Sequence, residues 1–216
     1  MVTNTYYTTQ LYPLQDKALK AISACKTSFY LTGGTALSRA YYNHRYSDDL
    51  DFFVNQDSTY TDQVEIILTA LIKQFTIKIT HRSESFLALT LQDKLKLDFV
   101  NDISFHSGKI LKKILYPQVD NVTNILSNKL SALISRDEAK DVVDIITIAA
   151  NEKVNWPQIF TDVNSKAVGI FPPDIVKRLN EFPLELIDQI KWVNTIPAKS
   201  DFAKQVKEIS KDILTG

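Results

Sequence analysis

Two adjacent glycines and a nearby pair of aspartates most constrain what this chain can fold into. Gly33 and Gly34, two of only five glycines, end an apolar run, and glycine lets a backbone approach another group closely. Asp49 and Asp51 enter a second apolar run, and side chains at i and i+2 of a strand share a face. Two like charges this close need a cation, and Mg²⁺ takes carboxylate and phosphate oxygens together. The stretch predicts a phosphate turn beside a metal-binding pair, an arrangement suited to nucleotidyl transfer.

Composition places the chain among ordinary folded proteins. It has 216 residues, of which 44% are hydrophobic and 23% charged, as expected for a folded chain. No apolar run reaches the roughly 20 residues that span a bilayer, and Met1–Thr5 lacks the basic and apolar regions of a secretion signal. The single cysteine, Cys25, excludes an internal disulfide and fits a reducing compartment. We expect a cytoplasmic protein that does not enter a membrane.

The charge balance gives no sign of a nucleic-acid partner. Lysine plus arginine equal aspartate plus glutamate at 25 each, and both halves of the chain are close to neutral. Nucleic-acid binding normally leaves a basic footprint. The local cluster of Lys109, Lys112 and Lys113 is typical of a solvated face.

The hydrophobic pattern predicts an α+β fold in two parts. Strand-like runs fall at residues 29–32, 50–54, 76–80, 86–91 and 94–100. Helical patterns fall at residues 14–26, 34–42, 58–75 and 122–135, the third of them capped by Ser58. From Asn121 onward every pattern is helical, interrupted only by prolines. We therefore expect a mixed-sheet domain over residues 1–117 and a helical domain over residues 118–216.

Asp98 is a candidate third carboxylate. Within 94–100, Leu95, Leu97 and Phe99 alternate with Lys94, Lys96 and Asp98, as a half-buried strand requires. If this strand lies beside 50–54, Asp98 shares a face with Asp49 and Asp51. The alternative is a solvated acid on an edge strand.

Lys129 lies in the middle of the apolar stripe of the helix at 122–135. A lysine in such a place either extends its charged end to solvent or meets a negative partner, and a triphosphate is one such partner. If Lys129 reaches a phosphate, Lys129→Met should keep the packing of the stripe and leave stability unchanged or improved.

The next helix carries several charges near its apolar face. Asp137, Asp141 and Asp144 lie on one strip, and Lys140 with Asp144 has the spacing of an exposed i,i+4 ion pair. The alternative is that Asp144, at the edge of the buried face, belongs with the buried lysine.

In this order, the motifs resemble the AbiEii/AbiGii toxin family of nucleotidyltransferases. The first block is Gly33-Gly34-Thr35-Ala36-Leu37, and the second is Arg45-x-Ser47-x-Asp49-x-Asp51. Lys129 follows, and then Arg136-x-x-x-Lys140-Asp141-x-x-Asp144. The resemblance runs from residue 29 to residue 144, somewhat over half of the chain.

The resemblance implies a polymerase β-type nucleotidyltransferase core followed by a helical domain, with Mg²⁺ as cofactor and a nucleoside triphosphate as substrate. Gly33, Gly34 and Thr35 would then form the turn that meets the triphosphate. Asp49 and Asp51 would bind the metal, and Asp98 would be the third carboxylate of the wider superfamily.

Further residues take roles from the same resemblance. Lys129 would contact nucleotide phosphates, and Asp144 would be the acidic residue of the last motif. Arg45 would pair with Asp51 or with the triphosphate, and Ser47 would cap a turn or contact phosphate.

Members of this family act as toxins in bacterial toxin–antitoxin and abortive-infection (phage-defence) systems, and some add nucleotides to the 3′ end of tRNA. A tRNA acceptor and a cognate antitoxin are therefore expected partners. Two alternatives remain open: a nucleotidyltransferase with a protein acceptor, and a non-catalytic nucleotide-binding module.

Overall fold

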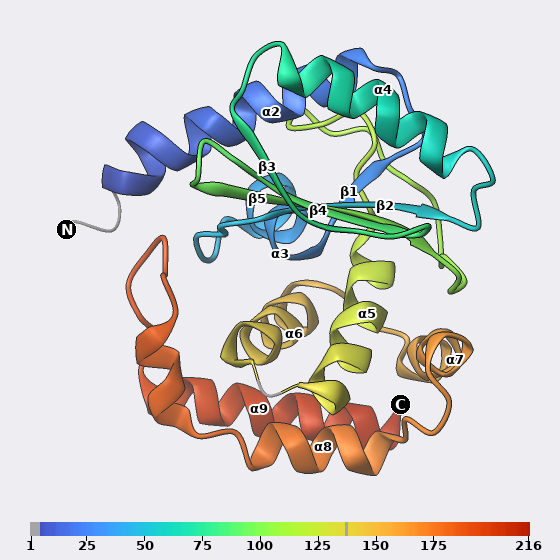
Figure 1. Cartoon of the computed structure of the whole chain (residues 1–216). Helices are drawn as coiled ribbons and strands as arrows, with labels where there is room; N and C mark the ends of the chain where they lie inside the picture. Colours follow the sequence, from blue (N-terminus) through green and yellow to red (C-terminus); the bar gives the residue numbers. More distant parts are fainter. Residues whose placement is uncertain (1–4, 137) are drawn as a thin grey trace. The chain divides into compact units, whose positions relative to one another are not determined.

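A computed structural model describes residues 5–136 and 138–216, which form two compact units (Figure 1). The first unit is the chain up to Ser104 together with Lys109–Asp120, and the second is Phe105–Gly108 with Asn121–Gly216. The expectations for Met1–Asn4 and for Asp137 lie outside the described residues.

A five-stranded mixed sheet with the order β1-β2-β5-β4-β3 organises the first unit. The strands are β1 (Tyr30–Thr32), β2 (Leu50–Asn55), β3 (Ile77–Arg82), β4 (Phe86–Leu91) and β5 (Leu95–Asp102). β2 and β5 run parallel, and the other neighbours are antiparallel. All five expected strands are present, and the mixed sheet confirms the predicted fold class.

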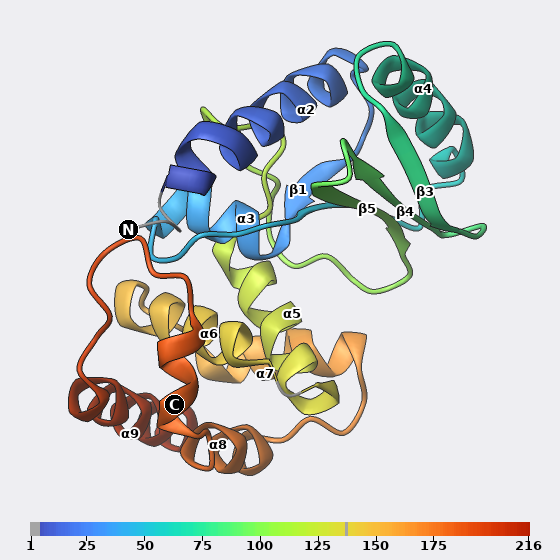
Figure 2. The ribbon, with the colours of Figure 1, turned by 60° about the vertical axis from the view of Figure 1, so that its left-hand side comes forward.

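Helices cover the two faces of this sheet differently. A π-helical turn η1 (Tyr7–Leu11) leads into α2 (Tyr12–Ala24), which packs beside α4 (Tyr60–Ile72) on one face. The short α3 (Gly33–Leu37) and η2 (Ser38–Tyr42) follow β1 and lie toward the other face (Figures 1 and 2).

The core explains this division of the faces. Leu50, Phe52 and Val54 of β2 are buried, whereas the residues between them are only partly buried. Phe52 stacks on Phe99 of β5 with ring centroids 5.1 Å apart, and aromatic burial of this kind contributes strongly to a core. The less buried face is left for polar side chains.

The predicted cap of α4 is wrong. The helix begins at Tyr60 with Thr59 as its N-cap residue, not at Ser58. The carboxylate of Asp57 accepts hydrogen bonds from the Thr59 amide and hydroxyl at 2.8 and 2.6 Å. Asp57 therefore forms the turn before the helix, a role for which aspartate is well suited.

The second unit contains helices and no strand among its described residues. They are α5 (Val122–Ser135), α6 (Ala139–Asn151), α7 (Trp156–Lys166), α8 (Pro172–Asn180), the 3₁₀ helix η3 (Leu184–Gln189) and α9 (Lys199–Thr215). The α5 bounds are those predicted, because Asn121 caps it by accepting from the Asn124 amide at 2.9 Å. Across both units, none of the described helices combines the length and apolarity needed to cross a bilayer.

Candidate functional site

Asp51 and Asp98 lie side by side on the less buried face of the sheet. Asp51 of β2 is the register partner of Asp98 of β5, and paired positions on neighbouring strands point to the same face. Asp49 immediately precedes β2, two residues before Asp51, and the charges of both aspartates act on Lys96. The expectation that the two strands are neighbours is confirmed. The alternative for Asp98 is wrong, because β5 lies between β2 and β4 and is not an edge strand.

The glycine turn lies directly against this carboxylate face. Gly33 has φ +68°, and a Cβ atom there would lie 2.4 Å from Oδ2 of Asp51. A Cβ on Gly34 would lie 2.5 Å from Nη2 of Arg45 and 3.2 Å from Oγ of Ser47. Only glycine leaves this space open and adopts the left-handed conformation without strain. The turn, Asp51, Arg45 and Ser47 therefore lie close together.

Arg45 and Ser47 are held in place beneath the turn. Arg45 is 5% exposed, and its Nη1 donates to the Tyr46 carbonyl at 3.1 Å. Ser47 is also buried, and its carbonyl accepts from Nε2 of Gln15 at 3.0 Å. These contacts fix the segment that leads into Asp49.

Thr35 differs from the expectation that its hydroxyl meets a phosphate. Its side chain is fully buried, and the hydroxyl donates to the main-chain carbonyl of Asp49. In this structure Thr35 ties α3 to the start of β2 and so positions Asp49.

Lys96 joins the carboxylate face, although sequence analysis gave it no role. Its Nζ lies 2.6 Å from Oδ2 of Asp98. Partial burial lowers the pKa of Lys96, but the hydrogen bond to Asp98 and the negative charges of Asp98, Asp49 and Asp51 outweigh it and raise the pKa above its usual value. The signal was present in the alternation, which placed Lys96 and Asp98 on one face.

The donor set fits Mg²⁺ bound by two carboxylates and completed by a substrate. Among the described residues, no three His, Cys, Asp or Glu side chains gather closely enough to hold a metal alone. Asp49 and Asp51 offer the hard oxygen ligands that Mg²⁺ prefers, and Mg²⁺ is commonly held by one or two carboxylates plus substrate phosphates. Asp98 has one buried oxygen, Oδ1, without a hydrogen-bond partner among the described residues.

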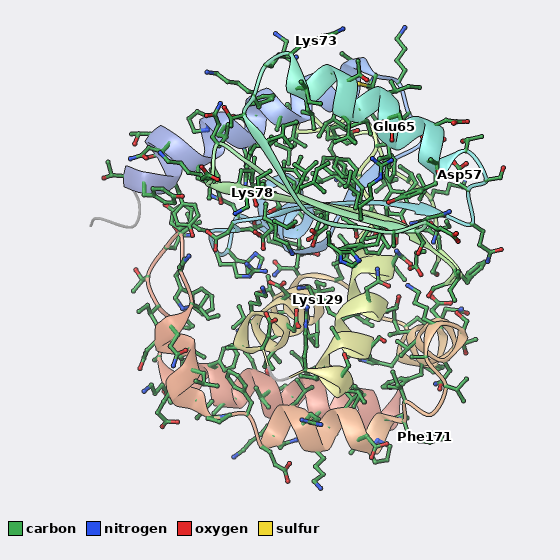
Figure 3. All side chains as sticks on the ribbon, viewed as in Figure 1. Asp57, Glu65, Lys73, Lys78, Lys129 and Phe171 are labelled. Atoms are coloured by element: carbon green, nitrogen blue, oxygen red, sulfur yellow. The ribbon has the colours of Figure 1, made fainter. Side chains whose placement is uncertain are left out.

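A second charged cluster lies within the helical unit. Lys129 extends from α5 (Figure 3). Its Nζ is 2.6 Å from Oδ1 of Asp141 and 2.8 Å from Oδ2 of Asp144, both on α6. Nε of Arg136 donates to Oδ2 of Asp141 at 2.8 Å. Lys129 is 6% exposed and both aspartates are fully buried. Lys129 therefore does not extend into solvent. It meets negative partners, as one of the two expectations had it, and these are the carboxylates of Asp141 and Asp144.

This cluster corrects two expectations. Nζ of Lys140 pairs with Oε2 of Glu138 at 2.8 Å, whereas Asp144 pairs with Lys129. The prediction of an exposed Lys140–Asp144 ion pair is therefore wrong. The stability expected of Lys129→Met is also overturned, because that change would leave two fully buried carboxylates without this cation. Asp141 joins the network although no separate role was assigned to it.

The electrostatic state of Asp141 reflects these neighbours. Burial raises its pKa, but Lys129 and Arg136 more than offset that effect and hold the pKa below its usual value. Asp141 is thus ionised in the folded protein near neutral pH.

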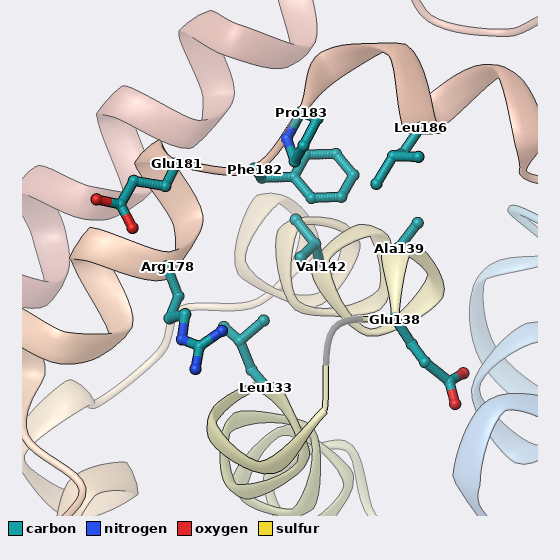
Figure 4. Close-up of a pocket in the computed structure, with 9 residues that line it drawn as sticks. All are labelled: Leu133, Glu138, Ala139, Val142, Arg178, Glu181, Phe182, Pro183 and Leu186. Carbon is teal, nitrogen blue, oxygen red and sulfur yellow. The ribbon is translucent and has the colours of Figure 1, made fainter.

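A pocket of about 320 Å³ opens beside this cluster in the helical unit (Figure 4). Its walls are mainly apolar, and its charged residues are one arginine and two glutamates: Arg178, Glu138 and Glu181. One cation against two carboxylates does not suit a triphosphate.

A basic groove of about 590 Å³ lies along α2, η2 and residues 112–117 of the first unit. Its lining contains four cationic residues against one acid: Lys20, Arg39, Lys112, Lys113 and Asp16. The Arg39 guanidinium lies 4.2 Å from the centre of the Tyr12 ring, and Nζ of Lys113 lies 4.1 Å from that of Tyr41. The neutral composition concealed this groove, because its cations come from distant parts of the chain.

The mixed sheet, the glycine turn and the Asp-x-Asp pair define a polymerase β-type nucleotidyltransferase fold. Similar folds occur in MenT4, a nucleotidyltransferase toxin from Mycobacterium tuberculosis (TM-score 0.67, 16% identity, covering 99% of this chain and 86% of that one). JHP933 from Helicobacter pylori is also similar (TM-score 0.58, 19% identity, 95% and 92% covered). The Megavirus polyadenylate synthase shares the fold over 71% of this chain and 36% of its own (TM-score 0.51, 14% identity).

Sequence comparison identifies the family. Residues 17–198 match the family described as "Nucleotidyl transferase AbiEii toxin, Type IV TA system". The chain therefore belongs to the AbiEii nucleotidyltransferase toxin family, which confirms the resemblance drawn from its motifs. None of the curated protein sequences matches it.

Proposed function

We propose that this protein is a Mg²⁺-dependent toxin that transfers a nucleoside monophosphate from a nucleoside triphosphate to a hydroxyl of RNA, with a tRNA 3′ end as the expected acceptor. The acceptor oxygen forms a bond to the α-phosphorus, the bond to the β-phosphate oxygen breaks, and pyrophosphate and a proton are released. The observation that carries the proposal is the Gly33–Gly34 turn pressed against Asp51, Arg45 and Ser47.

The residues of the sheet unit divide the work of this reaction. Asp49 and Asp51 would hold Mg²⁺, which when bound supplies positive charge to the triphosphate and the leaving pyrophosphate. Gly33 and Gly34 leave space for phosphate oxygens close to the backbone, and the Arg45 guanidinium lies beside that space. Positioning and charge neutralisation of this kind supply most of the acceleration in phosphoryl-group transfer.

Asp98 is suited to receive the proton of the acceptor hydroxyl. Its Oδ1 is buried without a hydrogen-bond partner among the described residues, and its strand position is next to Asp51. A carboxylate oxygen in this state has unused capacity to accept a hydrogen bond.

Lys129 and Asp144 take their proposed roles from the family resemblance. A phosphate contact by Lys129 would compete with Asp141 and Asp144, which hold its ammonium at 2.6 and 2.8 Å. Asp144 would then orient Lys129 through this pair.

The basic groove favours RNA over a protein acceptor. RNA backbones bind where Lys and Arg neutralise phosphates, and Lys20, Lys112 and Lys113 with Arg39 outnumber the one acid of the groove. The aromatic rings beneath Arg39 and Lys113 hold two of these cations in position. A cognate antitoxin, a phage-defence role and action in the cytoplasm complete the proposal and rest on family membership.

The proposal is tested with purified protein, Mg²⁺ and each of the four α-³²P-labelled nucleoside triphosphates. Parallel reactions contain total RNA, total protein extract or no acceptor. Label in RNA that is lost in Asp51→Asn supports the proposal. Label only in protein would establish the alternative acceptor, and nucleotide binding without transfer would establish the non-catalytic module.

A charge-reversal pair tests the groove in the same assay. Lys20→Glu with Lys112→Glu should weaken RNA binding by about tenfold or more at low salt, because phosphate contacts dominate that affinity. Lys73→Glu with Lys78→Glu makes the same charge change at two exposed lysines elsewhere (Figure 3). Equal loss in both pairs would mean a general charge effect and remove the groove from the proposal.

A further inference from the structure

Lys96 forms an ion pair with Asp98, the carboxylate next to those proposed to bind metal. Its Nζ lies 2.6 Å from Oδ2 of Asp98, and Asp98 is the register partner of Asp51. Lys96 and Asp98 are two residues apart on β5, so their side chains leave the same face of the sheet. The ammonium is therefore part of the carboxylate face itself.

The electrostatic coupling reaches beyond the one ion pair. Burial of Lys96 works against its charge, but Asp98 and then Asp49 and Asp51 stabilise it, so the pKa is raised. Three carboxylates on one face repel each other when no cation is present. A lysine that interacts with all of them reduces this repulsion.

The Lys96–Asp98 pair is also open enough to exchange. The Lys96 side chain is 49% exposed and that of Asp98 is 14% exposed. Ion pairs with such access to water contribute little to stability, so a divalent ion can replace the lysine at small cost. Oδ1 of Asp98, in contrast, is already without a hydrogen-bond partner among the described residues.

From these contacts we infer that Lys96 is an internal counter-cation, which neutralises the Asp49–Asp51–Asp98 face in the metal-free protein and competes with the divalent metal for it. With metal bound, Lys96 would hold Oδ2 of Asp98 less tightly, so that Oδ2 as well as Oδ1 would be open to the acceptor hydroxyl. Lys96 acts here as a positioning residue for Asp98. The inference rests on the proposed function, since it takes Asp49 and Asp51 as the metal-binding pair.

The test measures metal affinity alone, without nucleotide or acceptor. Free Mn²⁺ is followed by electron paramagnetic resonance, and Mg²⁺ is measured by its competition with Mn²⁺. Lys96→Met should bind Mn²⁺ about tenfold more tightly than the unchanged protein, because a competing unit charge beside Asp98 is removed. Lys96→Gln is the second variant, and Lys96→Arg, which keeps the charge, should restore the original affinity.

Lys94→Met is the matched control. Lys94 lies in the turn before β5 and donates to Oε1 of Gln10 at 3.2 Å. Lys94→Met should change Mn²⁺ affinity by less than about twofold, because its contact is to an amide oxygen and not to a carboxylate of this face. A purely structural role of Lys96 would not tighten metal binding.

The outcomes separate the inference from the proposed function. Absence of Mn²⁺ binding to the unchanged protein, or binding that Asp51→Asn leaves intact, would overturn the metal site itself. Mn²⁺ binding that depends on Asp51 but is equal or weaker in both Lys96→Met and Lys96→Gln would overturn only the counter-cation. Tighter binding in both, with Lys94→Met unchanged, supports it.

Discussion

The two units each contain a lysine held 2.6 Å from an aspartate, but in opposite surroundings. Lys96 and Asp98 in the sheet unit have side chains that are 49% and 14% exposed. The Lys129 side chain in the helical unit is 8% exposed, and the side chains of its partners Asp141 and Asp144 are fully buried. The same contact therefore has a different meaning in each unit, because the cost of breaking an ion pair grows with burial.

The exposed cluster, made of Asp49, Asp51, Asp98 and Lys96, can exchange its ion-pair partners when a ligand binds. Its carboxylates share one face, its counter-ion is a half-exposed lysine, and Gly33 has no side chain to clash with the Asp51 carboxylate. The buried cluster instead joins α5 to α6 through Lys129 and is closed by Arg136. Substitutions in the exposed cluster should therefore lower activity and leave stability unchanged. Substitutions in the buried cluster should lower stability.

The largest expected effect is on catalysis by the sheet unit. Asp51→Asn should lower nucleotide transfer by about 1000-fold or more, since charge stabilisation at the reacting phosphate is lost. Its free energy of unfolding, measured by urea denaturation, should be unchanged or slightly higher, because repulsion with Asp49 and Asp98 is relieved. Asp49→Asn should behave in the same way. Substantial turnover in both variants, still dependent on Mg²⁺, would refute this pair as the metal site.

Lys129→Met should have the opposite profile in stability. Removing the ammonium leaves Asp141 and Asp144 buried without it, which should lower the free energy of unfolding by about 3 kcal/mol. The double variant Lys129→Met, Asp144→Asn removes one of the two stranded charges and should recover part of the loss. Urea midpoints of the three proteins measure both effects.

Activity then distinguishes the two possible roles of Lys129. If the lysine also meets a phosphate, transfer stays low in the double variant even where stability returns. Recovery of transfer together with stability would make Lys129 a structural residue alone. An unchanged urea midpoint in Lys129→Met would contradict the claim that the buried cluster, unlike the exposed one, stabilises the folded protein.

Local patterns predicted the sheet unit well. The alternation in 50–54 and 94–100 predicted that Asp98 would share a face with Asp49 and Asp51 if the two strands were neighbours. The parallel pairing of β2 with β5 meets that condition and sets Asp51 beside Asp98. The alternation also contained Lys96, but only the register shows that its charge lies among the carboxylates.

Local sequence patterns could not predict the contacts between segments that are distant in the chain. The apolar stripe of 122–135 showed that Lys129 needs a partner, but the choice of Asp141 and Asp144 depends on how α5 packs on α6. The role of Thr35 could not be predicted for the same reason, because its hydroxyl donates a hydrogen bond to the carbonyl of Asp49, 14 residues away. The basic groove depends on four cations from three separate segments.

A smaller effect is expected at the glycine turn. Gly34→Val places a branched side chain where Nη2 of Arg45 lies 2.5 Å from the Cβ position. It should reduce the rise in melting temperature that Mg²⁺ with a nucleoside triphosphate produces, because that rise reports binding to the folded state. Gly34→Ala adds only the Cβ and should have a weaker effect, since the Arg45 end can move. An unchanged shift in folded Gly34→Val would argue against phosphate binding at this turn.

The smallest effect is the acid dependence of the buried cluster. Because Lys129 and Arg136 hold the pKa of Asp141 below its usual 3.8 despite burial, the unfolded chain takes up this proton at a higher pH than the folded protein. The associated stability is fully present above the unfolded pKa, so it is lost as the pH falls below about 4 toward the folded pKa. Asp141→Asn has no such proton to bind, and its urea midpoint should fall less steeply between pH 5 and pH 3. The exposed acid Asp62 serves as the control, since Asp62→Asn should keep the original slope. Equal slopes in Asp141→Asn and the unchanged protein would show that the buried cluster does not carry the ionised carboxylate that sets it apart from the exposed one.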